Sequence, residues 1–311
     1  MDDLGPEVPA NWYLLGPASQ LERGAIASHT IGKRAVVLWR GRDSAHVHAF
    51  DAHCAHMGCH LGHGDVIGDR LRCGLHHRLI DAEGRFGGRG GSNLRQPVIP
   101  IVEYLGGLWA HVGMQEPQLP LDRLELDAFP SCYAGEHHFA LPWQALVANG
   151  FDSEHLASVH ERRLLEVPRL DRVGDSGIEL RYRTEPVGTG LSDRLTGLLA
   201  PDGVIGHISA INGSLMLVRG QLGRRRSFIL MSFVPGKAND TIVRAIVGVE
   251  RGKGIWGSIQ ARIAARLFKS FLYKDLKVLE QLEWHEPQEA LSQGDRFTQQ
   301  LCAYFRGLPH G

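Results

Sequence analysis

The first hundred or so residues alternate short apolar runs with glycine and charged residues. Runs of this length, rich in β-branched and aromatic residues, favour strands over helices. The clearest are at residues 35–39, 45–50, 71–73 and 108–112. We therefore expect an all-β domain over residues 12–115.

A different pattern follows a proline-rich stretch at residues 115–130, which cannot form one continuous regular element. We place a domain boundary near residue 116 and a second domain over residues 116–311. Its apolar pattern predicts a helix at 143–160, strands at 178–184, 214–219, 227–234 and 241–250, and a long helix at 255–283. This order predicts an α+β domain with an antiparallel sheet and a long C-terminal helix.

The long C-terminal helix has an apolar row that contains one carboxylate. Apolar residues recur every fourth position, and Asp275 is the next member of the row. The row consists of Ile259, Ile263, Leu267 and Phe271, and Phe268, Leu272, Leu279 and Leu282 flank it. Asp275 is therefore predicted to face the core, where an unpaired carboxylate is costly. Either a metal ion or an internal ion pair with an arginine would remove that cost.

Charge and composition narrow the classes of partner. Lys plus Arg equals Asp plus Glu at 34 each, so no basic field favours nucleic acid or an anionic membrane. No apolar run approaches the ~20 residues of a membrane span, and the acidic start lacks a signal-peptide pattern. Five cysteines are too few and odd in number for a disulfide framework. We expect a cytoplasmic protein with reduced thiols.

Two cysteine and histidine pairs have the spacing of metal ligands. They are Cys54-Ala55-His56 and Cys73-Gly74-Leu75-His76, separated by sixteen residues. Two loops of this kind can close on a [2Fe-2S] cluster, with the cysteines on one iron and the histidines on the other. Mixed pairs also occur in structural zinc sites, although zinc fingers usually pair Cys with Cys and His with His.

A second candidate site lies in the helix predicted at 143–160. Asp152, His155 and His160 form the pattern Asp-x-x-His-x-x-x-x-His. Two histidines and a carboxylate suit ferrous iron with open positions, although these residues are also common on helix surfaces. A gap of five residues turns a regular helix by roughly 140° beyond a full circle. The histidines can therefore meet only if the helix ends or bulges between them, and Asp275 could complete the site.

With both sites present in this order, the sequence resembles the Rieske non-haem iron aromatic-ring-hydroxylating oxygenase family over nearly its whole length. The segment from Asn149 to His160 is similar to the family's mononuclear iron motif. Residues 275–280 are similar to the segment that carries the third ligand of that iron in the family. The Asn-x-x-Asp form and a short chain without a reductase module are closest to the homotrimeric, monooxygenase-like members. The resemblance implies a Rieske [2Fe-2S] domain followed by a helix-grip, START-like catalytic domain.

The resemblance also implies a working scheme. A separate ferredoxin or flavin reductase, drawing on NADH or NADPH, would reduce the cluster held by Cys54, His56, Cys73 and His76. Electrons would cross to the mononuclear iron of a neighbouring subunit through Asp152, which would hydrogen-bond to His155 and, across the interface, to His76. Asn149 would support this bridge. Iron bound by His155, His160 and Asp275 would then activate dioxygen beside a small, largely apolar substrate.

Two positions depart from related patterns. Cys59 resembles the extra cysteine of respiratory Rieske proteins, but its disulfide counterpart would be at Leu75, so we expect a free, small buried thiol. Arg78 stands where family members usually carry an aromatic residue. We therefore expect the packing around the cluster, or the docking of the electron donor or neighbouring subunit, to differ from that of the family.

Two competing functions remain open from the sequence. One is a Rieske electron carrier whose C-terminal domain binds a ligand without catalysis. The other is a structural protein stabilised by zinc. A carrier has no need for His155, His160 and a core-facing Asp275 together, so the second triad separates these possibilities.

Overall fold

The computed structural model describes residues 8–87, 93–113, 124–174, 177–187, 202–222, 225–250, 255–280 and 282–309. Within these residues the strands form one 8-stranded and three 3-stranded sheets. The expected α+β class is confirmed. The domain boundary expected near residue 116 lies outside the described residues.

The N-terminal part is built from short strands, as the sequence predicts. One sheet contains β1 (Asn11–Pro17), β9 (Gly107–Val112) and β8 (Ile101–Tyr104). A second contains β2 (Ile26–Ile31), β3 (Arg34–Arg40) and β4 (Val47–Asp51), and a third β5 (Asp65–Ile67), β6 (Arg70–Arg72) and β7 (Leu79–Ile80). Two short helical turns, η1 (Ala18–Gln20) and η2 (Leu61–His63), join them.

The C-terminal part contains the large antiparallel sheet, whose main path is β10-β17-β16-β15-β14-β13-β11. Its strands are β10 (Ser131–Phe139), β11 (Arg162–Leu164), β12 (Arg169–Val173), β13 (Gly177–Pro186), β14 (Val204–Ile211), β15 (Leu215–Leu222), β16 (Arg225–Pro235) and β17 (Thr241–Val249). The helices are α1 (Trp143–Phe151), α2 (Ser153–Ser158), α4 (Ile255–Leu279) and α5 (Gln293–Arg306). The four strands expected here are confirmed, whereas the sequence did not predict β10, β11, β12, β14 or α5. The single helix expected at 143–160 is wrong, because Asp152 lies between α1 and α2 and caps the second helix.

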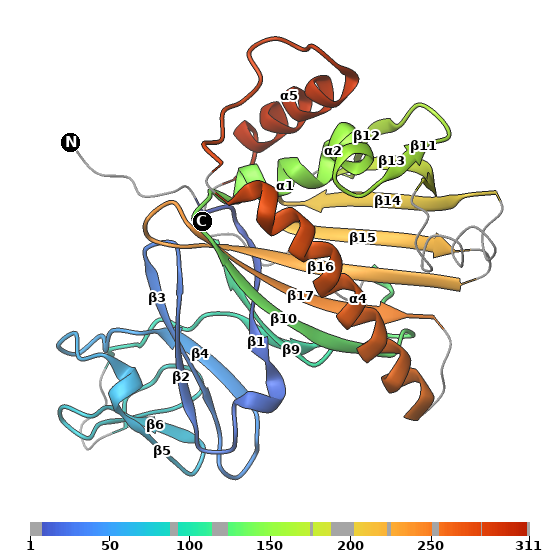
Figure 1. The fold of residues 1–311 in the computed structure, drawn as a ribbon. Coiled ribbons are helices and arrows are strands. Elements are labelled where there is room, and N and C mark those ends of the chain that lie inside the picture. Colours follow the sequence, from blue (N-terminus) through green and yellow to red (C-terminus); the bar gives the residue numbers. More distant parts are fainter. Residues whose placement is uncertain are drawn as a thin grey trace.

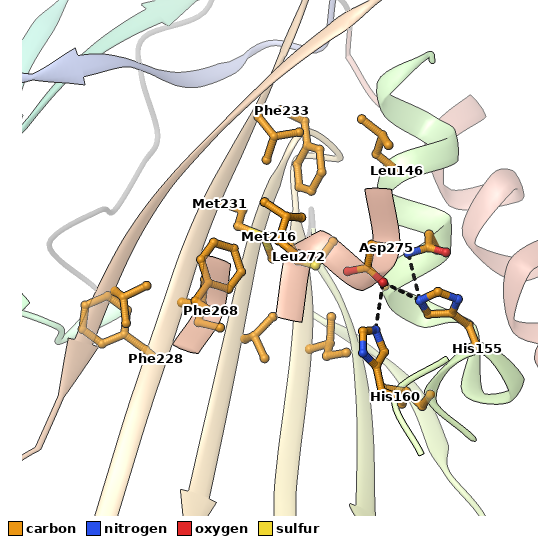
Figure 2. A pocket seen from close by; sticks show the side chains of 18 of the residues that line it. Leu146, His155, His160, Met216, Phe228, Met231, Phe233, Phe268, Leu272 and Asp275 are labelled. Atoms are coloured by element: carbon orange, nitrogen blue, oxygen red, sulfur yellow. Dashed lines mark hydrogen bonds and ion pairs between the residues drawn. The ribbon is translucent and has the colours of Figure 1, made fainter. Parts of the chain in front are cut away.

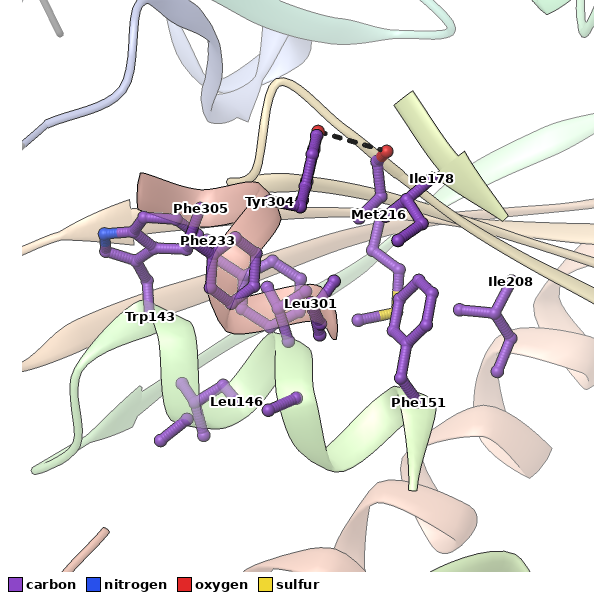
Figure 3. Packing of buried hydrophobic residues seen from close by; sticks show 14 of the residues in the cluster. Trp143, Leu146, Phe151, Ile178, Ile208, Met216, Phe233, Leu301, Tyr304 and Phe305 are labelled. Atoms are coloured by element: carbon purple, nitrogen blue, oxygen red, sulfur yellow. Dashed lines mark hydrogen bonds between the residues drawn. The ribbon is translucent and has the colours of Figure 1, made fainter. Parts of the chain in front are cut away.

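The large sheet is covered on both faces (Figure 1). On one face, residues of α1 and α5 pack against inward side chains of the sheet such as Met216 and Phe233 (Figure 3). On the other face, Trp12, Leu14 and Trp109 pack against apolar residues of β15 to β17. Leu14 N also donates a hydrogen bond of 3.1 Å to Ser232 Oγ. The sheet therefore joins the N-terminal part to the helices that carry the second candidate site.

Helix α4 lies across the large sheet and contacts β10 and β17 (Figure 1). Its inward face differs from the predicted row, because Ile259 and Ile263 are 39% and 51% exposed. Among the side chains of α4 that the structure describes, the buried ones are Ala261, Ala265, Phe268, Asp275 and Leu279, at intervals of three, four or seven. Leu267 and Phe271 of the predicted row lie outside the described side chains. Leu282, expected to flank the stripe, is also exposed. Small alanines let the helix approach the sheet, so packing rather than apolar content selects this face.

No helix in the part of the chain that the structure describes has both the length and the apolar character needed to cross a bilayer.

Candidate metal centres and cavity

The first candidate site lies on two tight turns that follow β4 and β6. In the first, Gly58 N donates to Cys54 O over 2.7 Å, and in the second His77 N donates to Cys73 O over 2.9 Å. Gly58 and His77 have φ values of 74° and 54°, the left-handed conformation that such turns need. The two Cys and His pairs are therefore presented by similarly shaped loops.

These loops bring the four predicted cluster ligands together. Cys54 and Cys73 are buried and in contact, whereas His76 is exposed. The rings of His56 and His76 lie 4.9 Å apart between centroids. The thiols are thus buried, and the two neighbouring imidazoles are more exposed.

The electrostatics of the loops suit a cationic group. Burial raises the pKa of the Cys54 thiol, and the neighbouring Cys73 adds to that rise. Desolvation lowers the pKa of His56, and the positive charge of Arg78 lowers it further, which favours the neutral imidazole needed for metal binding. Two adjacent buried thiolates need compensating positive charge, and two iron ions would supply it. The residues present therefore fit a histidine-ligated [2Fe-2S] cluster.

All five cysteines are free thiols, as expected. Leu75, at the position where a disulfide partner of Cys59 would lie, is exposed. Cys59 itself is half-buried rather than fully buried.

The second candidate site forms where α2 ends. This helix finishes at Ser158, and Val159 is its C-cap, so His160 lies outside the helix. The break lets the rings of His155 and His160 come within 4.9 Å of each other between centroids. Of the two possibilities left by the five-residue spacing, a helix end or a bulge, the structure has the helix end.

Asp275 of α4 meets both histidines. Its Oδ1 atom lies 2.7 Å from His155 Nε2 and 2.8 Å from His160 Nε2. All three residues are buried: Asp275 and His155 are each 8% exposed, and His160 is 6% exposed. Among the described residues the partners of this buried carboxylate are histidines, not the arginine considered as an alternative.

The triad has the geometry of a metal site. One ligand atom from each residue lies within 4.8 Å of the others. Ligands bound to one ion at about 2.1 Å would be roughly 3 Å apart in a right-angled arrangement, so small adjustments would accommodate a metal. Burial raises the pKa of Asp275, but hydrogen bonds from His155 and His160 outweigh it and hold the pKa below its usual range. The carboxylate is thus ionised and directed at two imidazoles, as a metal site requires.

The two other predicted residues lie beside the triad. The Asp152 carboxylate is the N-cap of α2 and accepts from the main-chain amides of Glu154 (2.8 Å) and His155 (3.3 Å). Its contact with His155 is therefore through the backbone, not the imidazole. Asn149 Nδ2 lies 3.4 Å from His155 Nε2, on the side that faces Asp275.

A cavity of about 380 Å³ opens beside the triad, between α4 and the large sheet. Figure 2 shows side chains such as Leu272, Phe268 and Phe228 following one another away from Asp275. The described lining combines strand residues such as Met216 and Met231 with helix residues such as Leu146 and Phe268, and residues 188–201 lie outside the described residues. Strand alternation shows which residues share a face, but not which face meets the helices.

Comparison with known proteins bears on these sites. Residues 11–93 match the Rieske [2Fe-2S] domain family. A putative toluene-4-sulfonate monooxygenase iron-sulfur subunit from Comamonas testosteroni is 30% identical over 166 residues, covering 50% of this chain and 47% of that protein. This chain is a relative of the Rieske oxygenases. Cholesterol 7-desaturase from Ciona intestinalis is 28% identical over 170 residues, covering 51% of this chain and 36% of that protein. Each match thus spans less than half of the relative's length.

Solved structures of Rieske oxygenases share the whole fold. Dicamba monooxygenase bound to dicamba has a TM-score of 0.68 at 17% identity, over 97% of both chains. NdmA from Pseudomonas putida CBB5 with caffeine has a TM-score of 0.75 at 16% identity, over 96% of this chain and 90% of that one. The order of a Rieske domain followed by a helix-covered antiparallel sheet is therefore that of the Rieske oxygenase fold.

Proposed function

We propose that this chain is the oxygenase component of a Rieske non-haem iron system. It would use dioxygen, and electrons from a separate ferredoxin or flavin reductase that draws on NADH or NADPH, to oxidise a small, largely apolar organic molecule. Monooxygenase-type chemistry, such as hydroxylation or demethylation, fits best, because relatives carry names such as vanillate O-demethylase oxygenase subunit and toluene-4-sulfonate monooxygenase. The observation that carries the proposal is the buried His155, His160 and Asp275 triad opening on an apolar cavity.

In this proposal Cys54, His56, Cys73 and His76 hold the [2Fe-2S] cluster, and His155, His160 and Asp275 hold one ferrous ion. When bound, the cluster would supply electrons and the ion would supply open positions for dioxygen. Asp275 contributes the negative charge, and the two imidazoles are kept in place by the end of α2. The apolar lining excludes water and holds the substrate against the triad.

Asp152 and Asn149 would act at the edge of this site. Figure 1 places the β5–β6 hairpin and α2 at opposite ends of the molecule, so the two sites of one chain are poorly placed to work together. We therefore assign electron exchange to neighbouring copies in a cytoplasmic homotrimer, with Asp152 facing His76 of the partner subunit. Asn149, whose Nδ2 lies 3.4 Å from His155 Nε2 at the edge of the metal site, would support this bridge.

Metal analysis separates the oxygenase from its alternatives. The oxygenase predicts about three irons per chain, and an electron carrier about two, from the ligand sets. A zinc protein predicts no iron and no paramagnetic signal on reduction. Two irons in a fully loaded preparation would contradict the proposal.

Replacing Asp275 tests the ligand set directly. Asp275→Ala should abolish turnover and lower the iron content by about one per chain, because the carboxylate ligand is lost. The visible absorbance of the cluster should be unchanged. Retained turnover would contradict the assignment of Asp275.

Mixed oligomers test the exchange between copies. A preparation that combines Cys73→Ser and Asp275→Ala chains contains trimers in which an intact cluster of one copy faces an intact triad of another. Such trimers should recover part of the turnover that each variant lacks alone. No recovery in demonstrably mixed trimers would contradict the exchange between subunits.

A further inference from the structure

The polar side chains of the cavity are concentrated at the triad, and the rest of its described lining is mostly apolar. Near the triad it has Asn149 as a further polar side chain, and elsewhere Tyr182 and Ser227 are the hydroxyl groups among its described lining residues. The other side chains are aliphatic, aromatic or thioether groups, among them Met216, Met231, Phe233 and Leu272. Hydrogen-bonding groups are thus scarce away from the triad.

Positive charge is absent from the described lining. No lysine or arginine is among the described residues that face the cavity, and Asp275 supplies its one acidic side chain. Burial raises the pKa of Tyr182 to about 12, so its hydroxyl stays neutral. Away from the triad, an anionic group of the substrate would lose its hydration without gaining a cationic partner, and that loss is costly.

The size and shape of the cavity add a second constraint. A volume of about 380 Å³ lies within the usual range for small-molecule sites. Its lining extends from Asp275 past Leu272 and Phe268 toward Phe228 (Figure 2), so an elongated molecule would present one end to the triad.

We infer that the substrate is an uncharged, elongated, apolar molecule that carries no carboxylate or sulfonate within the cavity. Any polar group away from the reacting end would be neutral, and Ser227 would be its hydrogen-bonding partner. This inference rests on the proposed function, since it describes the molecule that the triad would oxidise.

Matched pairs of compounds test the charge preference. Naphthalene with 2-naphthoate, 4-methylanisole with 4-methoxybenzoate, and 1-nonanol with nonanoate differ mainly in a carboxylate. Titration calorimetry on the iron-loaded protein should give a dissociation constant about tenfold or more lower for at least one neutral member than for its partner. If no neutral compound binds more tightly than its carboxylate, the inference is overturned.

A charge variant tests the physical cause. Ser227→Arg places a cation in the lining, whereas Ser227→Gln adds a long neutral side chain at the same position. The arginine variant should narrow or reverse the preference for the neutral compound, and the glutamine variant should not. The same preference in both variants would show that charge does not set it and would overturn the inference.

Iron content and oxygen uptake, measured on the same preparation, keep this test apart from the proposed function. About three irons per chain together with tighter carboxylate binding would leave the oxygenase standing and overturn the charge preference. Preferred binding of neutral compounds by a protein without iron at the triad would support the cavity's preference and contradict the oxygenase.

A second inference concerns Gln96, which is buried beside the first cluster loop. Its Oε1 accepts from Ala55 N at 2.8 Å, and its Nε2 donates to Asp51 O at 2.7 Å and His53 O at 3.1 Å. One side chain thus binds the main chain on both sides of Cys54. Close packing fixes its own backbone, because a Cβ on Gly84 would lie 2.2 Å from Gln96 O.

The geometry points to Gln96 as a positioning residue for the cluster. Its side-chain hydrogen bonds go to main-chain groups of Asp51, His53 and Ala55, so it acts by holding the loop that carries Cys54 and His56. Apolar replacement would remove these three hydrogen bonds from the main chain on both sides of Cys54, so the loop would relax.

Gln96→Met keeps the side-chain length and removes all three hydrogen bonds, and Gln20→Met, at an exposed position of the same domain, is the matched control. Gln96→Met should lose cluster absorbance to a chelator about tenfold faster and shift the paramagnetic spectrum and midpoint potential of the cluster. A purely structural role would lower the melting temperature and leave the spectrum and potential of the remaining cluster unchanged. That result, or no change at all, would overturn the inference.

Discussion

The two candidate metal sites are assembled differently. The four predicted cluster ligands come from two short turns, each of which supplies one Cys and one His. In the triad, Asp275 meets His155 and His160, which precede it by 120 and 115 positions. In the cluster loops two ligands are buried and His76 is exposed. All three triad residues are buried and face an apolar cavity. The first arrangement suits exchange with an outside partner, and the second suits isolation of a reaction from water. The first depends on local turns, and the second on the packing of α4 against the sheet.

The largest expected effect comes from Cys54→Ser, which removes a buried thiolate from the first site. Cluster absorbance and turnover should be lost, and iron should fall from about three to about one per chain, because the triad has its own core. Iron analysis and visible spectroscopy measure this. Cys132→Ser, at a half-buried thiol of β10, is the control and should retain both. Loss of all iron would contradict the independence of the two sites, because the triad would then need an intact cluster loop to hold its iron.

Phe268→Ala should have the next largest effect, because Phe268 packs against Ala134, Ala245 and Val247 of the sheet. We expect a loss of about 3 kcal/mol in the free energy of unfolding, and less iron at the triad. Ile263→Ala, on the exposed face of the same helix, should change stability by about 0.5 kcal/mol or less. Urea denaturation followed by circular dichroism measures both. Equal losses would show that the inward face of α4 is misassigned.

Replacing Asp152 separates its two roles. Asp152→Ala removes the N-cap of α2 and should cost about 1 kcal/mol of stability, whereas Asp152→Asn keeps a capping side chain and should cost much less. Both should slow turnover if the carboxylate joins the two sites between subunits. Thermal unfolding and single-turnover oxidation of the reduced cluster are the measurements. Normal single-turnover rates in Asp152→Asn would confine Asp152 to capping.

The smallest effect is on pH dependence where the two parts meet. His29 of β2 lies near the Arg244 and Glu136 ion pair of the large sheet. Burial, aided by the charge of Arg244, lowers the pKa of His29 from 6.5 to about 4. Below pH 6.5 the unfolded chain gains a proton that the folded chain does not gain until about pH 4, so stability falls as the pH drops through that window.

His29→Gln should remove this part of the pH dependence, and His138→Gln, at an exposed position of β10, should not. Melting temperatures recorded between pH 7 and pH 4 on the metal-loaded protein test the expectation. An unchanged slope in His29→Gln would contradict it.

The sequence by itself indicated the cluster loops, because the ligands of each pair are neighbours along the chain and each turn closes through a local main-chain hydrogen bond. The support that Gln96 gives to the first loop comes from a distant segment and appears only in the tertiary structure. The sequence also indicated that a helix carrying His155 had to end or bulge before His160 if both histidines were to meet, since a five-residue spacing cannot keep two side chains on one helix face. The structure shows that the helix ends.

Only the tertiary structure decided how the triad closes and what surrounds it. Asp275 does face inward, but in a row with Ala261, Ala265 and Phe268, not with the exposed Ile259 and Ile263. Apolar residues on both sides of α4 left two possible faces, and the fit of small side chains against β10 and β17 selected one. The cavity's lining comes from strands and helices far apart in the sequence, so its apolar character appears only when the sheet and α4 pack together.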